Sequence, residues 1–389
     1  MSERPAQPRR EGPTTLELAA RVVAGSDREH PADGVLREVL RTARGVSPDK
    51  ARRVSEAVFA YFRWRGWVDR QAPLETQLRT ALECRRAYAE APGSFADADL
   101  LSRAVPAWVK EHVEVTPAWV RSLQQEPVLW LRARPGQGRA LAAELGECRA
   151  AGGGCLADAL EYRGTSDLFR TPAFQGGGFE IQDLHSQAVG WVCDPQPGET
   201  WWDACAGEGG KTLHLSDLMQ NRGLIWASDV AEWRLRRLKL RARRAGVFNY
   251  RLAHWEGTER LPTRTRFDGV LVDAPCSNLG TWGRNPHARW TTRPEDVQEL
   301  AALQARLLAH AAPAVKPGGR LVYAVCTVTA AETVSRAAAF VEAHPTLRRE
   351  RLRDPVEAGK ADQADLFLRS DARRANGMYV AVWRRGNCA

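Results

Sequence analysis

Residues 200–219 read "TWWDACAGEGGKTLHLSDLM", and this stretch decides the fold of the C-terminal half of the chain. Its apolar start predicts a strand that ends at Asp203, and a glycine-rich turn then leads into a helix that opens at Lys211. Glycines at such a turn let backbone amides approach a nucleotide-like cofactor at the helix N-terminus. A phosphate-binding P-loop is disfavoured, because Cys205 occupies the position of that motif's first glycine. For the turn taken alone, a plain strand-to-helix connection remains the alternative.

Acidic residues follow the next strands of this half. "GLIWASDV" places Asp229 at the end of a second strand, "HWEG" places Glu256 just beyond a third, and Asp273 closes a fourth. A carboxylate at the end of the second strand can bind two ribose hydroxyls, and acids at successive strand ends line one crevice. Strands alternate with helical runs from Thr200 onward, which predicts a doubly wound α/β sheet.

Two cysteines stand at the ends of two apolar strands. One lies in "VLVDAPCSNLGTWGRNP", residues 270–286, and the other in "RLVYAVCTVTAAE", residues 320–332. A cysteine at such a position is either a small buried packing residue or a nucleophile. Taken singly, each of Cys276 and Cys326 favours the packing interpretation.

The N-terminal part predicts a helical bundle from about Thr14 to Leu123. Apolar residues recur there at helical spacing, and Ser47 followed by Pro48 and Asp49 is typical of a helix start. A short α/β segment follows, with a helix expected over residues 138–151. We therefore expect a helical domain at 1–125, a small α/β connector at 126–185 and a Rossmann-like domain at 186–389.

Composition narrows the class of protein. The 389 residues carry a formal net charge of +9, which is compatible with a polyanionic partner or with a solvated Arg-rich surface. No apolar run is long enough to span a bilayer, so we expect a cytoplasmic protein without a membrane partner. The eight cysteines form no Cys-x-x-Cys pair, and no metal site is expected.

Two further features leave alternatives open. In "EWRLRRLKLRARRAG", four arginines fall on one helix face and form either a solvated outer face or a phosphate-contacting stripe: Arg234, Arg237, Arg241 and Arg244. Trp282 and Trp290 could stack on a base or serve in packing.

Four motifs together resemble the RNA 5-methylcytosine methyltransferases of the Sun family: "DACAGEGGKT", "DAPCSNLGTWGRNP", "KPGGRLVYAVCT" and the preceding "EIQDLHSQ". The resemblance covers nearly the whole chain, since "VSPDKARRVSEAVFAYFRWRGWVD" is similar to a NusB-like RNA-binding domain and "NGMYVAVWRR" to the family's closing strand hairpin. It implies a Rossmann-like S-adenosylmethionine-dependent methyltransferase domain preceded by an all-α NusB-like domain and a small α/β connector. The implied partner is RNA, with ribosomal RNA the expected class, and the implied state is a monomer.

The family's site residues carry over to this sequence as expectations. Asp229 is expected on the cofactor ribose, Glu256 near its adenine, and Asp273 near its methionine end and the target base. The resemblance makes Cys326 the nucleophile and Cys276 the cysteine that assists release. S-adenosyl-L-methionine is expected along one continuous stretch, formed by Cys205, Ala206, Gly207, Glu208, Gly209, Gly210 and Lys211.

The chemistry gives a reason for two thiols. Carbon 5 of cytosine is a poor nucleophile until a thiolate adds to carbon 6, and the enzyme must later be expelled by elimination. A first cysteine can attack, and a second near it can assist release.

The sequence departs from the family pattern at five positions. Glu208 stands where proline is usual, Glu256 replaces an aspartate, His287 replaces an acid, Val325 replaces a threonine and Ala330 replaces a proline. None of these changes removes a reacting group, but they bear on substrate choice and cofactor affinity.

Two rival functions come from other classes. A DNA cytosine-5 methyltransferase would use the cysteine of the Pro-Cys pair as nucleophile, but Ser277 follows Cys276 where that class has glutamine, and no Glu-Asn-Val follows. A non-catalytic RNA-binding ribosome-assembly factor would have no need of both thiols.

Overall fold

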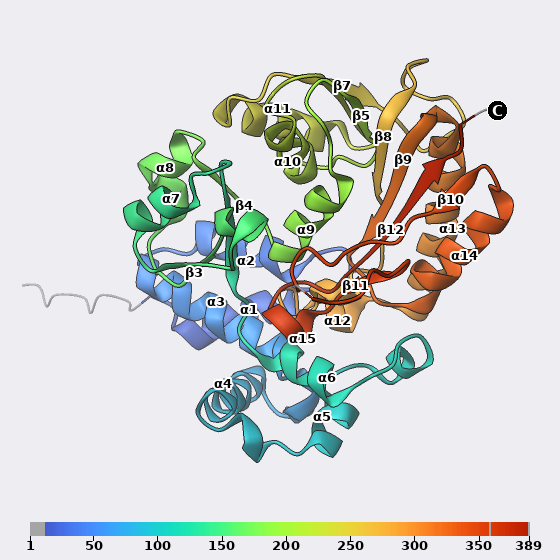
Figure 1. Ribbon diagram of the computed structural model, residues 1–389. Helices are drawn as coiled ribbons and strands as arrows, with labels where there is room; N and C mark the ends of the chain where they lie inside the picture. The colour runs from blue at the N-terminus through green and yellow to red at the C-terminus, as the bar shows by residue number, and fades with distance from the viewer. Residues whose placement is uncertain (1–11, 358, 388–389) are drawn as a thin grey trace, which may run out of the picture. The chain divides into compact units, whose positions relative to one another are not determined.

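A computed structural model describes residues 12–357 and 359–387 of the chain (Figure 1). Its internal contacts divide the chain into two compact units. Of the described residues, unit 1 comprises 12–109, 115–125 and 285–292, and unit 2 comprises 110–114, 126–284, 293–357 and 359–387. The expected connector falls within unit 2, and so does the expected Rossmann-like domain apart from residues 285–292; the division into three domains stays a prediction.

Unit 1 is helical, as its sequence predicts. Its core gathers apolar side chains from several helices, among them Leu18, Val54 and Trp64. The expected helix start is confirmed, because the Ser47 side chain accepts a hydrogen bond from the Lys50 N–H. The helices are α1 (Thr15–Ala24), α2 (Ala32–Thr42), α3 (Pro48–Arg63), α4 (Leu74–Glu90), α5 (Asp97–Arg103), α6 (Pro117–Gln124) and α12 (Ala288–Thr291).

The segment 285–292 comes from the end of the first cysteine motif yet packs within unit 1. Arg289 is fully buried and donates hydrogen bonds to the carbonyls of Ala104 at 2.9 Å and Leu123 at 3.0 Å. Trp290 donates its indole N–H to the Phe62 carbonyl at 2.6 Å and packs against the helical core. Both side chains therefore serve the packing of unit 1.

Unit 2 begins with a small antiparallel sheet in the order β2-β3-β1-β4. The helix expected over 138–151 is shorter than predicted: it ends at Leu145, because Gly146 adopts a φ of 61°. The following residues, Cys148–Ala150, instead form β2. The elements are β1 (Leu129–Ala133), α7 (Gly138–Leu145), β2, β3 (Ala159–Tyr162), α8 (Pro172–Gln175), β4 (Phe179–Ile181) and α9 (Leu184–Cys193).

A large mixed sheet forms the centre of unit 2, with its strands in the order β10-β12-β9-β8-β5-β6-β7 and β11 paired to β12. The strands from β5 to β9 pair in parallel, whereas β12 runs antiparallel to β9. The strands are β5 (Thr200–Asp203), β6 (Leu224–Asp229), β7 (Tyr250–His254), β8 (Phe267–Asp273), β9 (Val315–Val325), β10 (Leu347–Arg349), β11 (Leu366–Leu368) and β12 (Met378–Arg385). The closing hairpin expected from the sequence is thus confirmed.

Helices cover both faces of this sheet, as Figure 1 shows. Trp201 packs in the core under α9 and α10, while its neighbour Trp202 points to the opposite core, under α13 and α14. The helices are α10 (Gly210–Leu218), α11 (Glu232–Arg244), α13 (Pro294–Ala311), α14 (Val334–Ala343) and α15 (Ser370–Arg373). The predicted doubly wound, Rossmann-like sheet is confirmed.

The strand order fixes where a ligand can bind. From β5 the chain winds outward through β6 to β7, and it then returns to place β8 on the other side of β5. At such a switch point, the loops after the two central strands diverge and leave a crevice at their carboxyl ends. Among the described helices, none has both the length and the apolar character needed to cross a bilayer.

Candidate active site

The glycine turn after β5 needs its glycines. Gly207 and Gly209 have φ values of 55° and 87°, a region that residues with a side chain rarely adopt. A Cβ at Gly209 would also lie 2.5 Å from Cγ of Leu238 on α11. The turn therefore brings backbone directly to the N-terminus of α10, within the switch-point crevice.

Asp229 is bound to this turn. Its carboxylate, only 6% exposed, accepts the Gly207 N–H at 2.9 Å through Oδ2 and the Ala231 N–H at 2.8 Å through Oδ1. Each oxygen keeps a second lone pair that could accept a ribose hydroxyl. The end of β6 and the glycine turn, predicted as parts of one cofactor site, are thus in contact.

Lys211 and Asp273 form an ion pair in the crevice. Lys211 Nζ on α10 donates to Oδ2 of Asp273 at the end of β8 at 2.7 Å, and the lysine side chain is 10% exposed. Burial lowers the pKa of Lys211, but the charge and hydrogen bond of Asp273, with smaller contributions from Cys326 and Asp203, raise it above its ordinary value overall. A cation therefore stands at the first turn of α10, paired with Asp273 and in electrostatic interaction with Cys326.

The two motif cysteines are in direct contact. Their sulfur atoms lie 3.3 Å apart, with Cys276 buried and Cys326 half-buried. Cys326 also donates to Oδ1 of Asn278 at 3.0 Å. The hydrogen bond with Cys326, then burial, then the charges of Cys326 and Glu332 raise the pKa of Cys276 well above its ordinary value. Cys276 is therefore held as a protonated thiol, while Cys326 is the more accessible of the two.

Asp203 is a buried acid that closes β5. Its Oδ2 accepts from Thr212 Oγ1 at 2.6 Å, whereas Oδ1 meets no donor from the described residues. Burial raises the pKa of Asp203 to about 7, although the Thr212 hydrogen bond opposes this shift. The sequence predicts Asp203 at the end of the first strand but gives no sign that its carboxylate is buried.

Other predicted cofactor residues lie along the same turn or outside it. Ala206 is buried, and Cys205 is half-buried against the core under α13, where burial raises its pKa well above the ordinary value. Glu208 faces Arg237 at 3.8 Å, so this departure from the family pattern has a cationic partner. Glu256 is exposed beyond β7 and pairs with His254 at 3.3 Å. The structure thus brings the turn, Asp229 and Asp273 into the crevice region but leaves Glu256 at the solvent.

Two further residues of the cysteine motifs, Asn278 and Glu332, belong to the site although the sequence did not predict them as site residues. Asn278 has a φ of 60° and presents its amide to the sulfurs. Glu332 is fully buried and contacts both cysteine loops. Their position inside the two motifs was the only sequence feature that could have indicated a role in the site. The burial of Glu332 and its contact with Ser277, 55 residues away, depend on the fold.

The arginine stripe of α11 meets acids of the same unit. Arg241 pairs with Glu180 at 2.9 Å, Arg244 pairs with the same carboxylate, and Arg234 lies 3.9 Å from Asp229. These contacts favour a solvated outer face that pairs with acids of the same unit over a phosphate-contacting stripe, and Arg234 and Arg237 remain 45% and 58% exposed. Trp282 is fully buried, so its ring serves packing and is not offered to a base.

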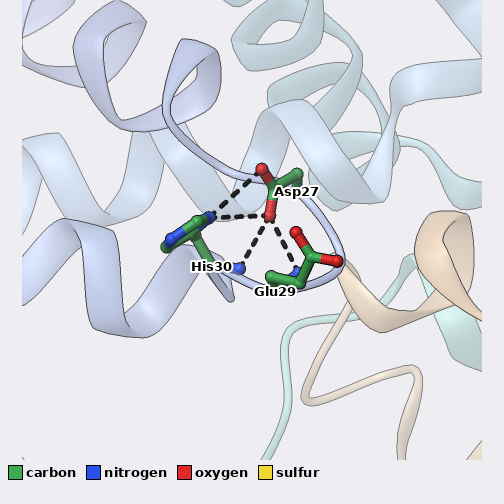
Figure 2. Close-up of side chains that lie close together, drawn as sticks. All are labelled: Asp27, Glu29 and His30. Carbon is green, nitrogen blue, oxygen red and sulfur yellow. Dashed lines mark hydrogen bonds and ion pairs between the residues drawn. The ribbon is translucent and has the colours of Figure 1, made fainter.

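A small cluster of potential metal ligands lies in unit 1, between α1 and α2. Figure 2 shows Asp27, Glu29 and His30, whose ligand atoms lie within 4.8 Å of one another and are exposed. The Asp27 carboxylate accepts from the backbone N–H groups of Glu29 and His30 and from the His30 ring at 3.0 Å. These hydrogen bonds account for the cluster as a tight turn.

Comparison with known proteins is informative for the second half of the chain. Residues 191–384 match the family model described as 16S rRNA methyltransferase RsmB/F. A curated relative from Synechocystis sp., a probable ribosomal RNA small subunit methyltransferase B, is 39% identical over 190 residues. That match spans 48% of this chain and 42% of the relative, so the chain covers less than half of the relative's length.

Solved structures extend the likeness of the fold. The crystal structure of PH0851 has a TM-score of 0.77 at 22% identity and covers 95% of this chain and 98% of its own. NSun6 from Pyrococcus horikoshii, solved with SFG, has a TM-score of 0.61 at 19% identity over 70% of this chain and 94% of its own. At these identities the likeness establishes the architecture.

Proposed function

We propose that this chain, which belongs through residues 191–384 to the 16S rRNA methyltransferase RsmB/F family, is an S-adenosylmethionine-dependent enzyme. Its proposed reaction is methylation of carbon 5 of a cytosine in ribosomal RNA. The observation that carries the proposal is the contact of Cys276 and Cys326 at 3.3 Å, beside the Lys211–Asp273 ion pair. Two thiols in contact within a cofactor crevice fit a reaction that begins by sulfur addition and ends by sulfur elimination.

Cys326 is the proposed nucleophile. It is half-buried and therefore within reach of a base that enters from solvent, and it interacts electrostatically with Lys211, whose positive charge can stabilise the attacking sulfur. In this proposal the Cys326 sulfur bonds to carbon 6 of the ring, and electron density moves to carbon 5. The DNA-methyltransferase order, with Cys276 as nucleophile, is disfavoured by its burial and by its raised pKa.

Cys276 is the proposed release residue. After methyl transfer, carbon 5 loses its proton and the bond between carbon 6 and the Cys326 sulfur breaks, so a thiolate leaves. A protonated Cys276 at 3.3 Å can donate a hydrogen bond to that departing sulfur and so stabilise it. Without this donor, elimination would be slower while addition could still occur.

The remaining residues of the crevice would bind and orient. S-adenosylmethionine supplies the methyl group when bound, and the donors and acceptors of the glycine turn and Asp229 are suited to hold its ribose and methionine parts. Asp273 is the proposed hydrogen-bond partner of the flipped cytosine, with Lys211 fixing its carboxylate. Glu256 is proposed to lie near the adenine, and we expect only a weak contact between them because the Glu256 side chain is exposed.

Unit 1 is proposed as an NusB-like RNA-binding domain. Its helical fold and the net charge of +9 for the chain support an RNA partner. For an enzyme that acts on ribosomal RNA, we expect a cytoplasmic, monomeric protein.

Incubation with methyl-labelled S-adenosylmethionine and separate pools of unmodified ribosomal RNA, transfer RNA and DNA tests the proposal. Label in 5-methylcytosine of the ribosomal RNA, recovered after digestion to nucleosides, is the expected result. Label at another atom or only in DNA would contradict it.

A further inference from the structure

The two cysteine loops are joined through a carboxylate that touches neither substrate nor cofactor in the proposed reaction. Glu332 lies in the short helical turn Ala330–Glu332, between β9 and α14, and its side chain is fully buried. A buried carboxylate is retained only where donors surround it, because transfer of its charge from water is otherwise strongly unfavourable.

The donors come from three separate parts of unit 2. Oε1 accepts the Ser277 N–H at 2.9 Å and the Gln304 side-chain amide of α13 at 3.0 Å. Oε2 accepts the hydroxyls of Thr327 at 3.2 Å and Thr329 at 2.8 Å, and also that of Ser277. Both oxygens of this carboxylate thus accept hydrogen bonds from within the fold.

The sequence positions of these donors explain why the carboxylate matters. Ser277 directly follows Cys276, and Thr327 directly follows Cys326. Their two hydroxyl oxygens also lie 2.8 Å apart, so either hydroxyl can donate to the other in place of its bond to Glu332. Gln304 reinforces the arrangement, because the same amide donates to the Pro275 carbonyl on the other side of Cys276 at 2.9 Å.

We infer that Glu332 is a positioning residue that holds the loops of Cys276 and Cys326 together and so sets the contact between the two sulfurs. The inference rests on the proposed function only for its consequence in catalysis, since the geometry it concerns is present without substrate. Removal of the carboxylate takes away the acceptor that five donor groups share and frees each thiol loop to move independently.

The two oxygens differ in a way that permits a sharp test. Oε1 meets only fixed N–H donors, whereas Oε2 meets only hydroxyls, which can rotate to accept. A glutamine at this position can therefore place its carbonyl at Oε1 and its NH₂ at Oε2 and keep the network without charge. Glu332→Gln is the geometry-preserving variant, and Glu332→Ala removes the network.

A matched control is available in the same loop. Thr333 is also fully buried, and its hydroxyl donates to the Thr329 carbonyl at 2.7 Å without contacting Glu332. Thr333→Val thus perturbs the loop while leaving the carboxylate and its donors to Ser277 and Thr327 in place.

The closing experiment uses phenylarsine oxide on the full chain. Its arsenic(III) centre forms two As–S bonds and releases water when two thiols are already in contact, with no change of oxidation state. Mass spectrometry follows the arsenical that stays bound to the protein in the presence of a monothiol competitor. The Cys276→Ala variant measures the background binding of the arsenical by the other cysteines. Wild type, Glu332→Gln and Thr333→Val are expected to capture the reagent within threefold of one another, and Glu332→Ala at least tenfold more slowly, with S-adenosylmethionine affinity kept within threefold. Equal capture by Glu332→Ala and wild type would overturn the inference.

If Glu332→Ala does not fold, as judged by circular dichroism, Glu332→Gln still decides. Because the charge of Glu332 contributes to the raised pKa of Cys276, its removal should shift the pH dependence of Cys276 alkylation by iodoacetamide to lower pH. An unchanged pH profile would contradict contact between this carboxylate and the thiol loop. If the arsenical results hold but wild type methylates no RNA, only the proposed function fails.

Discussion

Asp203→Asn should make unit 2 less sensitive to pH, because Asp203 is an acid that the fold buries with one oxygen lacking a donor from the described residues. Folding raises its pKa from 3.8 to about 7, chiefly through burial. Below pH 3.8 the group is protonated in both the folded and the unfolded state. Between pH 3.8 and about 7, the unfolded state is ionised while the folded state keeps the proton, so the free energy of unfolding falls as pH rises. Above about 7 the folded state is ionised as well, and the stability that the protonated form contributed is lost.

The size of the effect follows from the shift. A change of this size corresponds to about 4 kcal/mol over the whole range, and to about 2–3 kcal/mol between pH 5 and pH 8, at 1.36 kcal/mol per pKa unit. Asparagine has the same shape and can still accept the Thr212 hydroxyl, but it carries no charge. The wild type should therefore lose about 2–3 kcal/mol more than Asp203→Asn over this pH interval.

Urea unfolding followed by hydrogen exchange of peptides from β5 and α10 measures the effect within unit 2. Thr212→Val provides a control of opposite sign, because the Thr212 hydrogen bond lowers the pKa of Asp203 and its loss should steepen the pH dependence. Parallel pH profiles for wild type and Asp203→Asn would refute the reasoning and indicate that water or another group solvates the carboxylate.

Three further perturbations probe other parts of the molecule. Asp229→Asn should weaken S-adenosylmethionine binding by about 1.5–3 kcal/mol in calorimetry. Both carboxylate oxygens accept N–H groups, whereas an asparagine side chain has only one oxygen to accept them; unchanged affinity would remove Asp229 from the site. Lys211→Met should slow formation of the RNA adduct at least tenfold with RNA affinity retained, because the attacking sulfur of Cys326 loses the positive charge that interacts with it. Equal adduct rates would exclude that role. Arg289→Met should destabilise unit 1 by about 2–4 kcal/mol in urea unfolding, because the carbonyls of Arg63, Ala104 and Leu123 lose this donor. A loss below about 1 kcal/mol would show that water replaces it.

Local patterns in the sequence predicted most of the fold. The glycine turn after Asp203, the acids that close successive strands and the helix start at Ser47 each depend on neighbouring residues, and the structure contains all three. The prediction that the helix reaches residue 151 was wrong, because the helix ends at Leu145. The positive φ of Gly146 and the pairing of β2 with β3 override the helical spacing of the apolar residues.

Contacts between distant segments could not be predicted. The chain gives no sign that Glu332 is buried beside Ser277, or that segment 285–292 packs among the N-terminal helices. The second point changes how RNA binding should be tested, because deletion of residues 1–125 would also remove the carbonyl partners of Arg289. Point variants on the surface of unit 1 are the safer design.

The division of labour between the two thiols is the central claim, and trapping the covalent intermediate tests it most directly. Cys276→Ala, Cys326→Ala and wild type are incubated with S-adenosylmethionine and unmodified ribosomal RNA, then separated on a denaturing gel with and without nuclease. With Cys276→Ala we expect a nuclease-sensitive species of reduced mobility whose cross-linked peptide contains Cys326, because addition proceeds while elimination lacks its hydrogen-bond donor. Cys326→Ala should give neither adduct nor methylated RNA. An adduct that accumulates with Cys326→Ala and maps to Cys276 would reverse the assignment and contradict the account.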